Sequence, residues 1–521
     1  MSSGVRFGLA LLGLILAQAA LGLAAQEPRG KSPIERLREC TQSCERQRQS
    51  PERQEVCKKR CQEEYEREKE RYEEDIMTRG EREKESSNSP YVFEDRHFMT
   101  GMKTQHGQVR ILQRFTERSD LLRGIENYRV TLLEADPQTF VVPNHWDANA
   151  VIFVANGRGI VSLLRQDRRE SFNIKQGDIF RINSGTTTYL INSDKNQKLV
   201  LAKLLQPVNT PGQFQSFFGA GGENPESFFK AFSKEILEAA FNTRSDRLQR
   251  IFGQQKQGVI MKASEEQIRS MSHHEEGGIW PFAGEAKGTS TINIYQQQPK
   301  HRNQYGQLFE VDPTNYRQLK DLNIAVSLAN ITQAYNYKTI TNIIQHCCKR
   351  AHAAQKSTSR GAMTAPYYNS ETTKITLVLE GQGYCEMACP HLAEEESRRQ
   401  QGSEREKSER EKSETSTGPR YQKVSARLKR GTVMVVPAGH PFVAVASKNQ
   451  NLQLLCFEVN QKNNEKYTLA GRKNVMKYLE KEAKELAFGM PAREVEEVFN
   501  SQEEEFFFKG PRQEHEGRAE A

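Results

Sequence analysis

The sequence contains an internal repeat, which limits the possible folds more than any other feature. Residues 177–185 (GDIFRINSG) return as residues 431–439 (GTVMVVPAG), and residues 237–252 align without gaps on residues 484–499. In the two longer segments Phe241 falls on Phe488, Leu248 on Val495, Ile251 on Val498 and Phe252 on Phe499. A chain of 521 residues is also long enough for two separate cores. The repeat therefore predicts two equivalent domains, each followed by a helical segment.

Short apolar runs separated by turn residues fill both halves of the chain. Glycine, asparagine and proline punctuate them, a pattern typical of antiparallel sandwiches and barrels. The expected strands include residues 129–133, 151–155, 160–164, 198–204, 375–379, 432–436 and 452–459. We therefore expect a mainly β protein with two barrels.

The repeated segment that follows each barrel has the pattern of an apolar helix, a break and a second, amphipathic helix. Such an apolar stripe usually packs into a core. A barrel closes on itself, however, so an arm outside it has no core of its own to join. We expect both helical arms to bury their stripes at a subunit interface.

Residues 1–25 have the pattern of a secretory signal peptide. Arg6 supplies a positive charge, residues 9–16 are apolar, and residues 22–25 offer small side chains for cleavage. A membrane anchor is the alternative, but the apolar stretch is short for a span and no other long one follows. The mature chain should enter the oxidising secretory pathway, with no membrane association after signal removal.

Four of the nine cysteines lie within residues 26–62, as two C-x3-C pairs. Positions i and i+4 share one face of a helix, so two disulfides can join two short helices. Antiparallel packing predicts the pairs Cys40–Cys61 and Cys44–Cys57. A zinc site is the alternative, but the spacing and the lack of a nearby histidine disfavour it. The region is expected to be a small disulfide-stapled helical hairpin.

Charged residues are mixed along the chain. The 75 basic and 67 acidic side chains leave a net charge of +8, which is not the basic footprint of a nucleic-acid-binding protein.

Two stretches are almost entirely polar: a charged linker at 63–89 and a disordered loop at 394–419. The other expected boundaries are barrel 1 with its arm at 90–255, a linker at 256–302, barrel 2 with its arm at 303–500, and a tail at 501–521.

Residues 334–360 interrupt the connection between two expected strands. They carry the adjacent Cys347 and Cys348, which have no evident partners. We expect a retained intron or a gene-model error, which tryptic peptides from this segment in native protein would refute.

The N-I-T sequon just before this segment makes Asn330 the candidate glycosylation site, although a strand there would leave it partly buried.

The element G-x5-P-x-G at Gly431, Pro437 and Gly439 resembles the bicupin superfamily, whose fold is two jelly-roll-like β-barrels. In its metal-binding members, two histidines and a glutamate precede this element and a third histidine follows it. His145 lies near the histidine positions of the first half and is interpreted as a structural residue near the barrel mouth. The other corresponding positions hold Ala150, Thr188, Tyr368, Ser370, Lys374 and Phe442. A conventional cupin oxidase or isomerase is therefore excluded, and no enzyme is expected unless a different cluster, Cys389, His391 and His440, is redox-active.

Five short motifs resemble the vicilin-type 7S globulins. They are residues 89–93 (SPYVF), 142–148 (VPNHWDA), 384–391 (YCEMACPH), 437–441 (PAGHP) and 506–512 (FFFKGPR). The leading cysteine region also resembles the α-hairpinin-like extension of this family. The resemblance implies a non-enzymatic seed storage protein that forms homotrimers through its helical arms. Storage globulins of this type are often allergens. The resemblance also implies transport to the protein storage vacuole, processing by vacuolar proteases and breakdown on germination.

One group of residues is a candidate metal site. Cys389 and His391 lie two positions apart on an expected strand, so their side chains share a face, and His440 follows the repeated turn. A thiolate with two imidazoles favours copper or zinc. Some vicilins bind copper in this way with a tyrosine from the start of the first barrel, and the resemblance assigns that role to Tyr91. A storage function requires no cofactor. Copper is the candidate metal ion for this group of residues.

A second class of function stays open beside storage. The chain is alternatively a copper- or small-ligand-binding cupin with a defence role, whose N-terminal hairpin acts as an antimicrobial peptide. Basic residues such as Arg36, Arg38, Lys58 and Lys59 suit attraction to anionic microbial surfaces. They equally suit an ordinary solvated surface. A store should dominate seed protein, whereas a carrier need not.

Overall fold

The computed structural model describes residues 89–222, 224–272, 291–333, 361–392 and 420–511, with Cys40, Thr41, Ser43, Cys44, Cys57 and Cys61 near the N-terminus. The expected signal peptide, the insert at 334–360 and the polar loop at 394–419 lie outside the described residues, as does nearly all of the charged linker. The chain divides into two compact units, residues 1–81 and residues 82–520.

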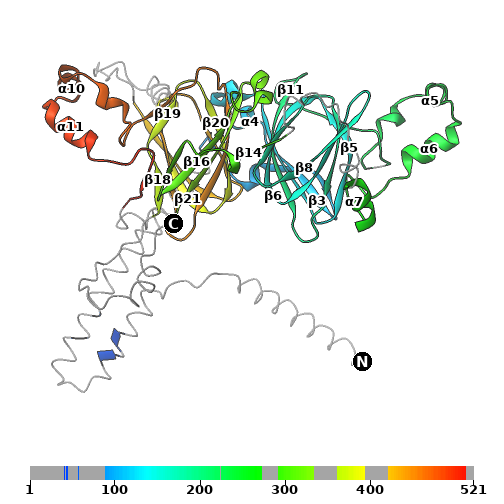
Figure 1. Cartoon of the computed structure of the whole chain (residues 1–521), viewed down its shortest axis with the longest axis horizontal. Helices are drawn as coiled ribbons and strands as arrows, with labels where there is room; N and C mark the ends of the chain where they lie inside the picture. The colour runs from blue at the N-terminus through cyan, green and yellow to red at the C-terminus, as the bar shows by residue number, and fades with distance from the viewer. Residues whose placement is uncertain are drawn as a thin grey trace, which may run out of the picture. The chain divides into compact units, whose positions relative to one another are not determined.

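Two antiparallel sheets form the first barrel (Figure 1). One sheet has the strand order β14-β9-β6-β11-β4-β3-β2, and the other has β12-β5-β10-β7-β8 with β13 beside β5. The bounds are β2 (Phe98–Thr104), β3 (Gly107–Leu112), β4 (Arg129–Ala135), β5 (Thr139–Trp146), β6 (Ala148–Asn156), β7 (Arg158–Leu164), β8 (Arg169–Lys175), β9 (Asp178–Ile182), β10 (Thr187–Asn192), β11 (Leu199–Pro207), β12 (Ser216–Phe218), β13 (Ile260–Lys262) and β14 (Ile292–Asn293).

The second barrel repeats this plan. One sheet has the order β1-β23-β20-β25-β17-β16-β15, and the other has β22-β21-β24-β18-β27, extended by β19 and β26. The bounds are β1 (Val92–Phe93), β15 (His301–Asn303), β16 (Gly306–Val311), β17 (Ile324–Ile331), β18 (Ala362–Thr364), β19 (Tyr367–Asn369), β20 (Thr373–Glu380), β21 (Gln382–Cys389), β22 (Gln422–Lys429), β23 (Val433–Val436), β24 (Phe442–Ala446), β25 (Leu452–Val459), β26 (Lys466–Thr468) and β27 (Phe507–Lys509).

The repeat seen in the sequence is a repeat of structure. Gly177 and Gly431 open the repeated element with φ values of 88° and 86°, a conformation that glycine adopts without strain. After barrel 1 come α5 (Lys234–Phe241) and α6 (Ser245–Gly253), and after barrel 2 come α10 (Lys481–Phe488) and α11 (Ala492–Asn500). In each arm the first helix ends on a residue in the left-handed conformation, Asn242 or Gly489. The expected pair of barrels with helical arms is confirmed.

The two barrels exchange their leading strands. β1 precedes barrel 1 in the sequence but pairs with β23 of barrel 2, placing Phe93 opposite Val433. β14 precedes barrel 2 but pairs with β9 of barrel 1, placing Ile292 opposite Ile179. One sheet of each barrel is therefore completed by a strand that precedes the other barrel in the sequence.

Strand β6 shows how the apolar side chains are divided between two cores. Ile152 and Val154 join the core inside barrel 1, whereas Val151 and Phe153 join the core that continues into barrel 2. Side chains alternate between the two faces of a strand, so both faces of β6 are buried. This apolar layer and the exchanged strands together join the barrels.

Several segments expected as linker or tail contribute ordered elements. The expected linker at 256–302 holds β13, α7 (Glu265–Ser272), β14 and the start of β15, and the expected tail holds β27. One further helix, α4 (Phe115–Arg118), precedes β4. Among the described helices, none has the length and apolar character needed to span a membrane.

Candidate functional site

In barrel 1, the positions that hold metal ligands in a catalytic cupin carry other residues. Ala150 on β6 is buried opposite Leu205 on β11. The hydroxyl of Thr188 donates to the carbonyl oxygen of Thr186 at 3.2 Å. His145 on β5 stacks on Phe217 of β12, with ring centroids 5.0 Å apart. These positions therefore offer no group of imidazoles for a metal.

In barrel 2, the position of the ligand glutamate is occupied by a buried cation. The Nζ atom of Lys374 lies 3.1 Å from a carboxylate oxygen of Glu458 and donates to the Tyr367 hydroxyl at 3.0 Å. Burial opposes the charged amine, yet Cys456, Glu458 and Tyr367 hold its pKa well above the usual value. Burial likewise opposes the Glu458 carboxylate, but Lys374 beside it keeps the pKa of Glu458 low. An internal ion pair thus fills this site.

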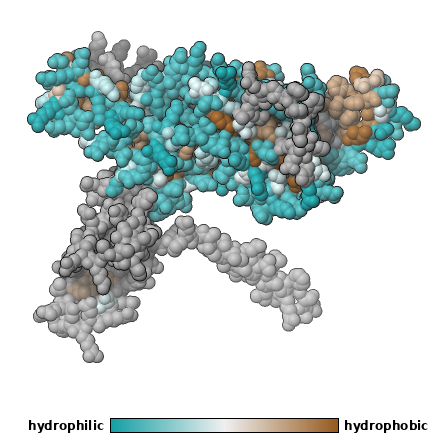
Figure 2. Space-filling model, viewed as in Figure 1, coloured by the Kyte–Doolittle hydropathy of each residue, from teal (hydrophilic) through white to brown (hydrophobic). Residues whose placement is uncertain are grey.

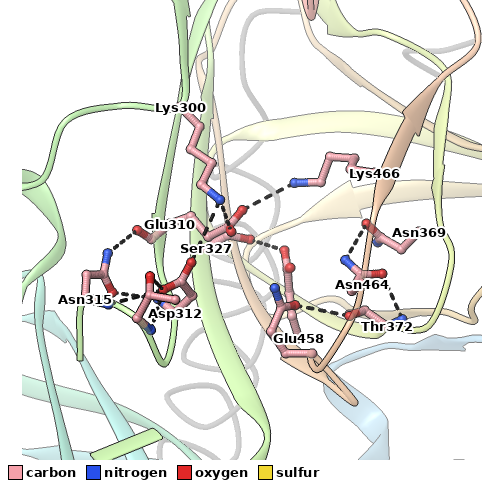
Figure 3. A network of polar contacts seen from close by, with 12 residues as sticks. Lys300, Glu310, Asp312, Asn315, Ser327, Asn369, Thr372, Glu458, Asn464 and Lys466 are labelled. Carbon is pink, nitrogen blue, oxygen red and sulfur yellow. Dashed lines mark hydrogen bonds and ion pairs between the residues drawn. The ribbon is translucent and has the colours of Figure 1, made fainter. Parts of the chain in front are cut away.

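Glu458 of this ion pair lies in a larger polar network that includes Glu310 on β16 and Ser327 on β17 (Figure 3). Ser327 donates its hydroxyl hydrogen to Glu458 at 2.5 Å. On β16, the buried carboxylate of Glu310 pairs with Lys300 at 2.5 Å and with Lys466 at 3.5 Å. Charges buried in this way are costly unless each has partners, and here each has at least one. The network therefore stabilises the barrel.

The expected metal ligands lie together at one end of β21. The ligand atoms of Cys389, His391 and His440 all lie within 4.8 Å of one another. The ring centroids of the two histidines are 5.0 Å apart. One detail differs from the expectation: β21 ends at Cys389, and His391 lies in a helical turn instead of on the strand. Pro390 explains this, because proline has no N–H to donate to a neighbouring strand.

Tyr91 completes the cluster from a distant part of the sequence. Its hydroxyl lies 3.6 Å from Sγ of Cys389, and its ring centroid lies 6.1 Å from that of His440. Tyr91 is fully buried and directly precedes β1, so the strand exchange brings it to barrel 2. The structure therefore places all four proposed ligands together.

The orientation of His440 suits a metal ligand. Its Nδ1 atom lies 3.0 Å from the carbonyl oxygen of Ala438, which assigns the ring hydrogen to that nitrogen. The Nε2 atom is buried without a hydrogen-bond partner among the described residues. Burial also lowers the pKa of His440, which favours the neutral imidazole. A backbone contact that fixes the tautomer, with the other nitrogen left free, is typical of metal-binding histidines.

The N-terminal disulfides are confirmed, with Cys40 bonded to Cys61 and Cys44 to Cys57. All four sulfurs are therefore used in S–S bonds, and the structure does not support the alternative zinc site. Asn330 lies on β17, where its side-chain oxygen accepts a hydrogen bond from Gln453 at 2.9 Å. Its glycosylation stays a prediction.

Comparison with known proteins agrees with this geometry. The family model described as Cupin matches residues 105–249 and 346–496. Vicilin Jug r 6.0101 of walnut (Juglans regia) is 47% identical over 523 residues, covering 98% of this chain and 97% of that protein. Vicilin-like antimicrobial peptides 2-2 of Macadamia integrifolia is 43% identical, over 83% of this chain and 60% of that protein. The crystal structure of hazelnut (Corylus avellana) vicilin aligns with a TM-score of 0.67 at 45% identity, covering 81% of this chain and 100% of that one.

Fold and site together define a bicupin protein in which neither barrel carries the usual metal ligands. More specifically, the chain belongs to the vicilin family of 7S globulins, the seed storage proteins.

Two lysines lie in the interior of the barrels, which was not predicted from the sequence. Lys374 was identified only as the replacement of a ligand, and its partner Glu458 was not identified at all. The interior of barrel 1 holds a second lysine, Lys203 on β11, which was assigned only to a strand. A lysine within an otherwise apolar strand was the available signal in both cases.

Proposed function

We propose that this seed storage protein acts without catalysis, as a homotrimer assembled through its helical arms. It would be held in the protein storage vacuole and degraded by vacuolar proteases during germination. One observation carries the proposal: both arms expose apolar side chains that a monomer leaves in water. Exposed apolar groups of this kind mark interaction surfaces.

Both arms show this exposure, and one pair of the exposed residues, Ile251 and Val498, occupies equivalent positions of the repeat. In the first arm Ile236 and Ile251 are 56% and 58% exposed, and in the second Leu486 and Val498 are 87% and 70% exposed. Figure 2 shows hydrophobic residues gathered over the arm of α5 and α6. A single chain carries one arm at each barrel. In a closed ring, the first arm of each copy can pack against the second arm of the next copy, and this contact buries the exposed apolar side chains of both arms.

Light scattering on the purified protein tests this proposal. The wild-type chain should have three times the mass of one mature chain. The double variant Leu486→Glu/Val498→Glu should be largely monomeric, because two carboxylates would enter an apolar interface. Met99→Glu is the matched control, since Met99 is 54% exposed on barrel strand β2. A wild-type monomer, or equal dissociation by the control, would contradict the proposal.

A second candidate function is copper binding by Cys389, His391, His440 and Tyr91. It is supported by the ligand atoms of Cys389, His391 and His440, which lie within 4.8 Å of one another, and by the Nε2 atom of His440, which has no hydrogen-bond partner among the described residues. Copper bound there would supply redox chemistry or a tight structural crosslink. The protein's part is to hold the thiol and imidazoles together and to keep His440 in the neutral form, while the exposed His391 leaves the site accessible from solvent.

Titration with copper tests this second function. One equivalent should bind and produce a copper–thiolate absorption band. Cys389→Ser should abolish the band, whereas Cys385→Ser should leave it unchanged. Cys385 is a suitable control because it is also a buried free thiol on β21. If the protein takes up no copper, or if both variants lose the absorption band equally, copper binding by this cluster is ruled out.

A defence role for the N-terminal hairpin rests on its two disulfides and on the antimicrobial name of the macadamia relative. A peptide of residues 26–62 in oxidised form should inhibit microbial growth at low salt. The same peptide with all four cysteines replaced by serine is the control. Inactivity of the oxidised peptide would exclude this role.

A further inference from the structure

The cavity inside barrel 1 contains one charged side chain. The cavity has a volume of 280 Å³, is partly open, and lies between the two sheets of the barrel. Aliphatic and aromatic side chains form most of its wall, including Ile152, Val161 and Leu201. Lys203 reaches it from β11 and is the only lining residue that carries a charge at neutral pH. The wall includes no carboxylate to balance that charge.

The surroundings of Lys203 differ from those of the interior lysine in barrel 2. Its Nζ atom lies 4.5 Å from the centre of the Trp146 ring, a contact that offsets part of the cost of burial. Within the described part of the chain, Lys203 has no ion pair. Neither member of the barrel 2 ion pair recurs in barrel 1, where Leu205 faces Ala150 at the positions at which Glu458 faces Lys374. Lys203, which occupies the position of Cys456, therefore has an apolar leucine two residues along its strand where barrel 2 has the carboxylate of Glu458.

We propose that the barrel 1 cavity captures small apolar aldehydes as an imine with Lys203. The lone pair of Nζ attacks the carbonyl carbon, and a C=N bond replaces the C=O bond. The two N–H hydrogens leave with the carbonyl oxygen as one molecule of water, so no oxidant or reductant is needed. The apolar wall receives the alkyl chain of the aldehyde.

The electrostatics of the cavity support this chemistry. Burial lowers the pKa of Lys203 to about 8, from a usual value of 10.5. At pH 7 about one tenth of the amine is then unprotonated, roughly 300-fold more than for a solvated lysine. Only the unprotonated amine attacks a carbonyl. Near neutral pH, Lys203 should therefore react in preference to the many surface lysines.

Borohydride trapping with hexanal tests the proposal on the full-length protein. At pH 7, with one equivalent of aldehyde, peptide mapping should place a single hexyl group on Lys203. Lys374, equally buried but paired with Glu458, should stay unmodified and serves as an internal control. Raising the pH to 9 should spread the label to surface lysines and reduce the preference for Lys203.

Two variants separate the site from general lysine reactivity. Lys203→Met should abolish the trapped adduct. Leu205→Glu keeps the lysine but supplies a carboxylate two residues along the same strand face, and should lower labelling of Lys203 at pH 7 at least tenfold. Circular dichroism must show both variants folded. Labelling spread evenly over surface lysines, or binding of hexanoate with no trapped hexanal, would overturn the proposal.

Discussion

The hydroxyl of Tyr91 lies 3.6 Å from Sγ of Cys389, although the two residues are 298 positions apart in the sequence. The contact exists because β1, which leads into barrel 1, pairs with β23 of barrel 2. The candidate copper site is therefore also a point at which the two halves of the chain are joined. Changes at Tyr91 should affect metal affinity more than stability.

Tyr91→Phe should lower copper affinity roughly tenfold, because the ring stays in place while the hydroxyl beside the thiol is lost. The free energy of unfolding should change by no more than about 1 kcal/mol, the usual net value of one hydrogen bond. A competition titration with a copper chelator and a urea denaturation curve measure the two effects. Unchanged copper affinity would show that Tyr91 is not a ligand.

Glu458→Gln should destabilise the protein by about 3–5 kcal/mol, since it leaves the Lys374 ammonium buried without its counter-charge. The double variant Lys374→Met/Glu458→Leu removes both charges and should lie much nearer to wild type. Denaturant unfolding of the three proteins makes the comparison. Equal losses in the single and double variants would show that packing, and not charge, determines the effect.

The same pair predicts how stability depends on pH. The pKa of Glu458 is lowered in the folded state, so its contribution is complete above the ordinary value of 4.5 and is lost as pH falls through the lowered value. The pKa of Lys374 is raised, so its contribution is complete below the ordinary value of 10.5 and is lost only as pH rises above that value toward the raised one. Below pH 4.5 the wild type should therefore lose more stability than the double variant. Thermal unfolding from pH 7 to pH 3 tests this, and parallel curves would contradict it.

Two turn glycines should differ in their tolerance of alanine. Gly381 and Gly439 both have positive φ, at 84° and 76°. A Cβ atom at Gly381 would overlap the carbonyl oxygen of Asn451, whereas one at Gly439 would meet nothing within 4 Å. Gly439→Ala should cost about 1–2 kcal/mol from backbone strain alone, and Gly381→Ala clearly more. Similar melting temperatures for the two variants would contradict the geometry.

Local patterns in the sequence were sufficient to predict the two barrels, the arms and the N-terminal disulfides. Repeated glycines and apolar periods are local signals, and the C-x3-C spacing limits the possible pairings. The strand exchange was not predicted, because β1 and β14 are two residues long and carry no period. The ion pair between Lys374 and Glu458 was missed for a related reason. It depends on the register between β20 and β25, which no short stretch of sequence encodes.

Storage is the central claim, and quantifying this protein in seeds through germination tests it most directly. Mass spectrometry of mature seed should place it among the most abundant proteins, and its intact chain should fall steeply within the first days after imbibition. A minor protein whose level persists through seedling growth would contradict the account, and would favour a carrier of copper or of a small ligand instead.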